Sequence, residues 1–283
     1  MTATPELTKS DGSSNGHDEH ASPGVDASLS QSLLSLRGIS KNFGPVQALQ
    51  DCDLDVPAGE VTALLGDNGA GKSTFIKCIS GIYAPSAGKM FWRGKEVHVH
   101  SPRDAAALGI ATVYQDLALC DNLDIVQNMY LGREETHLGL LDEIKMEVAT
   151  KQTLMDLSVT TVQSVRQLVG SLSGGQRQAV AVARAVMRDS QLVIMDEPTA
   201  ALGVSQTKLV LELIRTLASR GISVLVISHN LTDVFSVVDR IAVMHLGTIV
   251  SQGPVANYDT TSAVELITTG ESSRVASRLA SSL

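Results

Sequence analysis

The sequence predicts an α/β fold with a largely parallel β-sheet. Three short runs, at residues 61–65, 192–195 and 223–227, are almost continuously apolar, and helical patterns separate them along the chain. Strands of a parallel sheet have this composition because helices cover both faces of such a sheet. A glycine-rich loop follows the first run, and two carboxylates follow the second. The alternation of buried strands and helices is the basis of the predicted fold.

The chain divides into a polar N-terminal segment and a domain. Residues 1–31 have few large apolar side chains, so we expect a disordered tail that cannot bury enough surface to order itself. One domain is expected over residues 32–270, because no internal repeat is visible, followed by a C-terminal tail over residues 271–283.

Composition restricts the compartment and the partners. The formal net charge of −8, without a basic block, argues against sequence-independent binding of nucleic acid, which needs lysine and arginine to neutralise phosphates. No run reaches the ~18 apolar residues of a membrane helix, and the N-terminus has no signal-peptide pattern. The three cysteines are widely spaced, which favours a reducing compartment. We expect a cytoplasmic protein unless a partner takes it to a membrane.

The first third of the domain contains both antiparallel and parallel strand patterns. Residues 34–37 and 51–56 alternate apolar and polar side chains, as half-buried antiparallel strands do. A turn at residues 57–60 precedes the apolar run at 61–65, and a helix is expected over residues 73–80, directly after the glycine-rich loop. The strand, loop and helix therefore form one unit.

The rest of the domain contains a helical stretch and the remaining strands. Residues 118–187 have no long strand pattern and are expected to form a helical subdomain. Residues 208–218 form an amphipathic helix, with apolar side chains at 209, 210, 213, 214 and 217. A final pair of strands is expected to begin at residues 240–245.

The glycine-rich loop matches the phosphate-binding motif G-x-x-x-x-G-K-[ST] in full. Its residues are Gly66, Asp67, Asn68, Gly69, Ala70, Gly71, Lys72 and Ser73, followed by Thr74. Glycines allow backbone N–H groups to converge on phosphate oxygens, and the start of the following helix adds a positive dipole. We expect Lys72 to reach the β- and γ-phosphates of ATP, and Ser73 to bind Mg²⁺.

Two adjacent carboxylates end the apolar run at 192–195. Asp196 is expected to hold Mg²⁺ through water, and Glu197 to act as general base on the attacking water. Alone, an acidic strand end would be unremarkable. Together with the phosphate-binding loop it indicates a P-loop NTPase.

A third motif indicates which class of P-loop NTPase the sequence resembles. Leu172, Ser173, Gly174, Gly175 and Gln176 resemble the LSGGQ signature of ATP-binding cassette proteins, and they precede the paired carboxylates by about twenty residues, as in that family. The resemblance covers roughly residues 34–255. It implies a RecA-like core with a mostly parallel sheet, an antiparallel β subdomain and a helical signature subdomain.

The resemblance also implies roles for three further residues. Phe43 matches the aromatic residue that stacks on adenine, and Gln115 matches the glutamine that approaches Mg²⁺ and water. His229 matches the switch histidine that contacts the γ-phosphate. One departure is Gly203, where the family usually has an aspartate that links the two nucleotide sites.

The family resemblance implies partners. Two cassettes pair head to tail, so that Ser173, Gly174, Gly175 and Gln176 act on ATP held by the other copy; with one cassette in the chain, we expect a homodimer. Integral-membrane permease subunits and, through them, a periplasmic or extracellular solute-binding protein are the other expected partners. The cassette would then lie at the cytoplasmic face of the cell membrane.

The substrate class rests on a more specific resemblance. Residues 113–134, together with residues 101–105 and 227–231, are similar to ribose-, xylose- and fructose-type importer cassettes. Only 283 − 229 = 54 residues follow His229, too few for the regulatory domain usual in oligosaccharide importers. We therefore expect an importer of a monosaccharide. The alternatives are an exporter subunit and an ATPase that acts on DNA or ribosomes.

Overall fold

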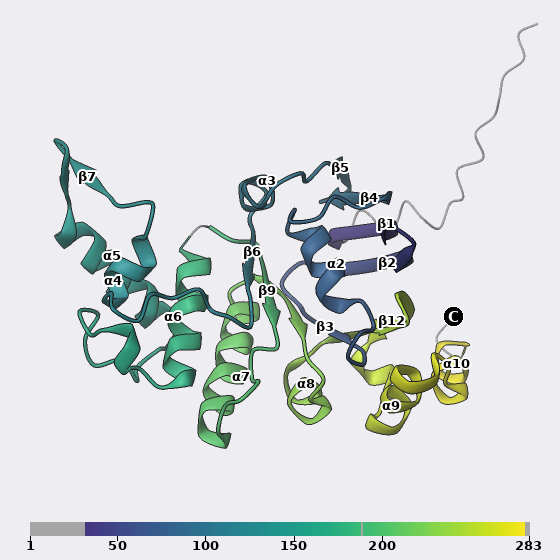
Figure 1. The fold of residues 1–283 in the computed structure, drawn as a ribbon. Helices are drawn as coiled ribbons and strands as arrows, with labels where there is room; N and C mark the ends of the chain where they lie inside the picture. The colour runs from purple at the N-terminus through teal and green to yellow at the C-terminus, as the bar shows by residue number, and fades with distance from the viewer. Residues whose placement is uncertain (1–31, 188, 281–283) are drawn as a thin grey trace, which may run out of the picture.

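The computed structural model describes the backbone of residues 32–187 and 189–280, which form two large sheets and a mainly helical lobe with a two-stranded hairpin (Figure 1). The tail expected over residues 1–31 lies outside the described residues, as do residues 281–283. No helix in the described part of the chain combines the length and the apolar composition needed to cross a membrane.

The central sheet has six strands in the order β12-β11-β3-β10-β9-β6. Its strands are β3 (Val61–Leu65), β6 (Ile110–Val113), β9 (Leu192–Asp196), β10 (Ser223–Ile227), β11 (Arg240–His245) and β12 (Thr248–Pro254). All neighbours are parallel except β11 and β12, which pair antiparallel. The predicted α/β fold with a mostly parallel sheet is confirmed.

A second sheet is antiparallel and has four strands in the order β2-β1-β4-β5. Its strands are β1 (Ser32–Phe43), β2 (Val46–Pro57), β4 (Ala87–Trp92) and β5 (Lys95–Val97). Burial alternates along β2 from Cys52 to Val56, as the sequence pattern predicts, because one face of that strand packs on the core. In β1, which lies between β2 and β4, residues 32–36 are all buried, so the alternating pattern there does not reflect one exposed face.

Helices lie on the central sheet and in a lobe at one side of the molecule. On the core they are α2 (Lys72–Ile79), α3 (Pro102–Ala107), α7 (Val204–Ser219), α8 (Leu231–Val237), η2 (Val255–Asn257), α9 (Thr260–Thr269) and α10 (Ser273–Ala280). The lobe contains α4 (Ile125–Tyr130), the hairpin β7 (Thr136–His137) and β8 (Leu140–Leu141), α5 (Glu143–Asp156), η1 (Val169–Ser171) and α6 (Gly174–Val186). Figure 1 shows this lobe on the side away from the antiparallel sheet.

Apolar side chains fill both faces of the central sheet. Leu64 of β3 packs in one cluster with Phe75 of α2, beneath the antiparallel sheet. Its neighbour Leu65 points to the opposite face, where it belongs to the cluster that contains Ile214 of α7. All four side chains are fully buried, which explains why the strands are continuously apolar.

Candidate nucleotide-binding site

The phosphate-binding loop connects β3 to α2, as the sequence predicts. Gly69 has a φ of 84°, and Gly71, the residue before the helix, has a φ of 107°. Residues with a Cβ rarely adopt these backbone conformations. Lys72 and Ser73 are the first residues of α2. Their backbone N–H groups therefore lie at the helix end that attracts anions.

Strand β11 and the turn that follows it pack against the loop. A Cβ on Gly66 would lie 2.5 Å from the carbonyl oxygen of Met244, so only glycine allows this approach. The turn after β11 continues the contact, because the N–H of Gly247 donates to the carbonyl of Ala70 at 2.9 Å. The sequence analysis missed this support. Its only signal is a glycine in a short turn between two strands.

A cleft of about 500 Å³ opens above the loop. We call it the P-loop cleft. Its lining residues are Val46, Gln47, Ala48, Asn68, Gly69, Gly71, Lys72, Ser73, Thr74, Gln115, Asp196, Glu197, Leu246 and Gly247. The structure thus brings together residues from separate segments of the chain.

Topology explains this convergence. Parallel strands end at the same edge of a sheet, and polar residues that follow them meet there. The P-loop follows β3, Gln115 follows β6, Asp196 is the last residue of β9, and His229 comes shortly after β10. These strands are neighbours in the central sheet.

Burial and neighbouring charges shift the pKa values of Lys72 and Asp196 in the cleft. Lys72 is 8% exposed, and its Nζ donates to the carbonyls of Gly66 and Asp67 at 2.7 and 2.9 Å. Burial lowers the pKa of Lys72, while the nearby carboxylates Glu197 and Asp196 oppose that shift. Burial and the charge of Glu197 raise the pKa of Asp196. A cation bound beside Asp196 would favour its ionised form.

Glu197 is held in an unusual backbone conformation. Its φ is 51°, in the left-handed region, and its N–H donates to the carbonyl of Ile227 at 2.9 Å. The Oε1 of Glu197 lies 2.9 Å from Nδ1 of His229, whose side chain is largely exposed. The backbone of Glu197 is strained, and its carboxylate has an imidazole partner beside a phosphate-binding loop. A carboxylate in this place is suited to accept a proton from water.

Several predicted residues are not among those that line this cleft: Gly66, Asp67 and Ala70 of the loop itself, His229, Phe43 and the signature residues 173–176. Ser173 caps α6 through a capping box with Gln176, at the start of a helix of the lobe. Phe43 ends β1 with 43% of its surface exposed, and its ring lies edge-on to Tyr83 at 5.2 Å between centroids. Within the described chain, the signature therefore lies apart from the P-loop cleft.

Close packing explains the signature glycines. A Cβ on Gly174 would lie 2.8 Å from Cδ2 of Leu202, and one on Gly175 would lie 3.1 Å from Cβ of Gln206. Gly203, in contrast, has φ of −74°, and a Cβ added to it would meet no atom within 4 Å. The backbone at residue 203 would therefore accept the aspartate usual in the family.

Comparison with known proteins identifies the family. A family model described as ABC transporter matches residues 49–200. A xylose/arabinose import ATP-binding protein of Sulfolobus acidocaldarius is 48% identical over 218 residues, which cover 77% of this chain and 86% of the relative. The chain belongs to the ABC transporter family. A fructose import ATP-binding protein of Rhizobium meliloti is also 48% identical, covering 76% of this cassette and 85% of the relative.

Further relatives agree with this assignment. A ribose import ATP-binding protein of Caldanaerobacter subterraneus is 36% identical, and the ABC cassette covers 47% of its length. A solved ATP-binding cassette of an ABC transporter in its ADP conformation has a TM-score of 0.72 and 25% identity, covering 88% of this chain and 98% of that structure. The expected fold class and ATPase family are therefore confirmed.

The oxygen donors of the cassette suit a small divalent cation. Ser73, Gln115 and Asp196 all line the P-loop cleft, and hydroxyl, amide and carboxylate oxygens are ligands that Mg²⁺ accepts. Residues 32–187 and 189–280 contain no group of three His, Cys, Asp or Glu placed to bind a metal. Mg²⁺ is usually bound through one or two carboxylates together with water and the phosphates of a substrate.

Proposed function

We propose that this cassette hydrolyses ATP to power a membrane importer of a monosaccharide. The similarity that carries the proposal is 48% identity to the cassettes of two sugar importers, over at least 85% of the length of each. It favours import over the alternatives of an exporter or an ATPase of DNA or ribosomes. The single cassette over residues 32–270, with its helical subdomain at about 118–187, is part of the proposal.

The P-loop would bind the phosphates of ATP. In this arrangement backbone N–H groups from Gly66 to Thr74 surround the phosphate oxygens, and Lys72 turns from the loop carbonyls towards the β- and γ-phosphates. Phe43 would stack on adenine, a role that needs its ring to approach the cleft from the end of β1. Burial of Lys72 increases its attraction for the phosphates, because few water molecules screen it.

Residues at the carboxyl ends of the parallel strands would carry out the hydrolysis. Ser73, Gln115 and Asp196 would hold Mg²⁺, which neutralises the charge that develops on the phosphates. Glu197 would take the proton of the attacking water. The contact with His229 orients that carboxylate, and His229 would also reach the γ-phosphate.

A second copy of the chain would complete each site. The signature residues Ser173, Gly174, Gly175 and Gln176 lie outside the P-loop cleft of their own chain, which supports their action on the ATP of a partner. We propose a head-to-tail homodimer with two equivalent sites. In it, the N-terminus of α6 would point at the γ-phosphate bound by the other subunit.

The permease would bind the cassette at the cytoplasmic face of the membrane. Residues 113–134, which resemble sugar-importer cassettes, begin at the end of β6 and run through α4. Arg184 of α6 donates to the carbonyls of Leu117 and Ala118, at 2.9 Å each, and so ties this stretch to the signature helix. An external solute-binding protein would deliver the sugar to the permease. The acidic charge gives no support for nucleic acid as a partner.

Deletion of the gene is expected to abolish uptake of one monosaccharide. The cassette supplies the energy for transport, so uptake should stop whatever sugar the permease selects. The measurement is the initial rate of uptake of labelled pentoses, hexoses, amino acids, a peptide and a metal ion, in deletion cells carrying either the wild-type gene or an empty vector. Loss of amino-acid, peptide or metal uptake, with every sugar still entering, would contradict the proposed substrate class and leave the ATPase assignment intact.

A further inference from the structure

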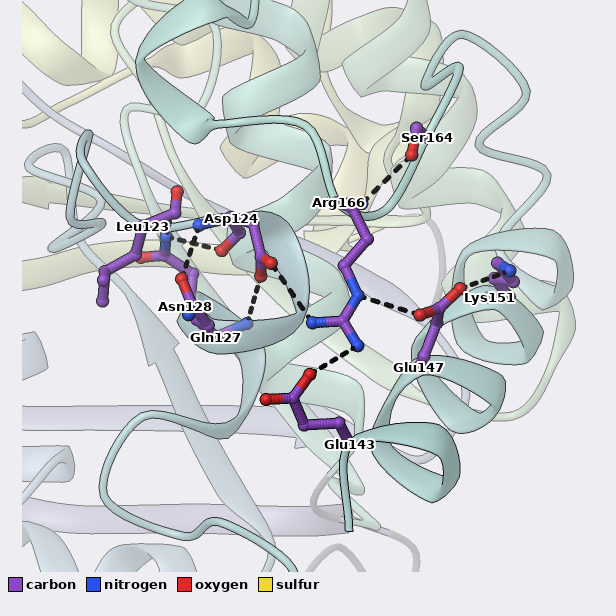
Figure 2. Close-up of polar contacts among 9 residues, drawn as sticks. All are labelled: Leu123, Asp124, Gln127, Asn128, Glu143, Glu147, Lys151, Ser164 and Arg166. Atoms are coloured by element: carbon purple, nitrogen blue, oxygen red, sulfur yellow. Dashed lines mark hydrogen bonds and ion pairs between the residues drawn. The ribbon is translucent and has the colours of Figure 1, made fainter. Parts of the chain in front are cut away.

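Arg166 joins three carboxylates from two helices of the lobe. Its Nε donates to Oε2 of Glu147 at 2.8 Å, its Nη2 lies 3.1 Å from Oε2 of Glu143, and its Nη1 lies 3.4 Å from Oδ2 of Asp124. Figure 2 shows the guanidinium between these groups, with Lys151 on the far side of Glu147. One planar side chain thus links α4 to both of the first two turns of α5.

The charged groups around Arg166 are mostly negative, so its positive charge matters to the cluster. The cluster contains three carboxylates and two cations, Arg166 and Lys151, since Nζ of Lys151 lies 2.6 Å from Oε1 of Glu147. Hydrogen bonds from Lys151 and Arg166 lower the pKa of Glu147. Removal of Arg166 would leave three carboxylates with one lysine, and it would remove the contacts that tie the start of α4 to α5. Arginine suits this position because its fork donates in several directions at once.

Asp124 connects this cluster to the backbone of the lobe. It is 8% exposed, and it caps α4 through a capping box, accepting from the N–H of Gln127 at 2.7 Å. The carboxylate that Arg166 contacts therefore also determines where α4 begins.

A strip of backbone hydrogen bonds connects this cluster to the segment that leads to the signature. The N–H of Val126 donates to the carbonyl of Val165 at 3.3 Å, and that of Ile125 donates to Gln167 at 3.2 Å. Further along, Gly170 donates to the carbonyl of Asp121 at 3.0 Å. Residues 165–170 thus pair with residues 121–126. The strip ends three residues before Ser173.

The segment that follows Gln115 is also tied to α4. Asn128 is fully buried, and its amide both accepts from the N–H of Cys120 at 2.7 Å and donates to the carbonyl of Cys120 at 2.9 Å. Residues 120–126 are therefore fixed on one side by Asn128 and on the other by the segment that contains Arg166. Both sets of contacts lie on the segment that pairs with residues 165–170, directly before the signature.

We propose that Arg166 is a positioning residue for the ATP site of the partner subunit. It holds residues 165–170 against α4 and α5, so that Ser173 and the start of α6 face the nucleotide bound by the other copy. Arg166 itself does not touch the nucleotide. The inference rests on the proposed head-to-tail pairing.

Arg166→Ala is expected to lower kcat on the order of 10- to 100-fold, as a small misplacement of a catalytic group does. ATP affinity measured on the monomer should change less than about twofold, because the P-loop cleft lies outside the cluster. Arg166→Lys keeps the charge and should recover part of kcat. The control is Lys145→Ala, which removes one exposed ion pair between α5 and Glu135 and should leave kcat unchanged.

Mixed dimers locate the defect. A heterodimer of Arg166→Ala and Lys72→Ala chains, isolated through two different tags, has one site with an intact P-loop and an intact partner signature, so it should regain activity. A heterodimer of wild type with a chain that carries both substitutions should not. A role confined to the stability of its own subunit would not distinguish these two dimers. If Arg166→Ala does not fold, Arg166→Lys is used in the same pairs.

Two results would overturn the proposal. The first is equal activity of the two mixed dimers while a reference dimer of Ser173→Arg and Lys72→Ala recovers, which would place the effect of Arg166 outside the signature. The second is weaker ATP binding by the Arg166→Ala monomer with kcat unchanged. Failure of the reference dimer as well would refute the head-to-tail pairing on which the proposal rests.

Discussion

Lys72→Ala is expected to abolish ATP hydrolysis and to weaken ATP binding on the order of 100-fold or more. Lys72 is the buried cation closest to the expected position of the β- and γ-phosphates, and a charge-assisted hydrogen bond contributes about 1.5–3 kcal/mol. Two such bonds account for the predicted loss. Because burial already disfavours the charged lysine, the variant should remain folded.

The test combines a binding and a kinetic measurement. Nucleotide affinity is measured by calorimetry and phosphate release by a coupled assay, with thermal unfolding as the control for folding. Lys89→Ala is the matched variant, since Lys89 forms an exposed pair with Glu96 on the antiparallel sheet. A folded Lys72→Ala protein that hydrolyses ATP at the wild-type rate would refute the assignment of the P-loop cleft.

Glu197→Gln is expected to separate ATP binding from turnover. The amide has the shape of the carboxylate but cannot accept the proton of water, and loss of a general base lowers the rate about 10²- to 10⁴-fold. Binding should persist because Lys72 and the loop amides are unchanged. The variant should therefore accumulate as a closed, ATP-bound dimer.

Single-turnover kinetics and sedimentation test this separation. Glu197→Gln should show phosphate release near background and, with ATP, a species of twice the monomer mass. Glu212→Gln, an exposed glutamate on α7, is the control and should turn over normally. Hydrolysis by Glu197→Gln at the wild-type rate would show that another group activates water.

Local motifs predicted the P-loop and the strand that ends at Asp196. Gly66 to Ser73 could be recognised because a loop that surrounds phosphate needs glycines at set positions within one short segment. The continuous apolar strands were recognisable for a similar reason, since burial on both faces leaves a simple pattern. The convergence of Gln115 and Asp196 then follows from the parallel order of β6 and β9.

Contacts between distant segments were not predictable in this way. The support of the P-loop by Gly247 depends on the pairing of β11 with β3, which no local pattern reveals. The cluster around Arg166 has the same character, because its carboxylates lie 19 to 42 residues away in the sequence. Taken alone, each of its charged residues is typical of an ordinary solvated side chain.

The most direct test of the account is the ATPase rate of a heterodimer of Ser173→Arg and Lys72→Ala chains. Each homodimer should be inactive, because one lacks the signature at both sites and the other lacks the lysine. The heterodimer has one site with Lys72 from one chain and Ser173 from the other, so it should hydrolyse ATP. A purified heterodimer as inactive as the two homodimers would contradict the claim that two copies of the chain share each site.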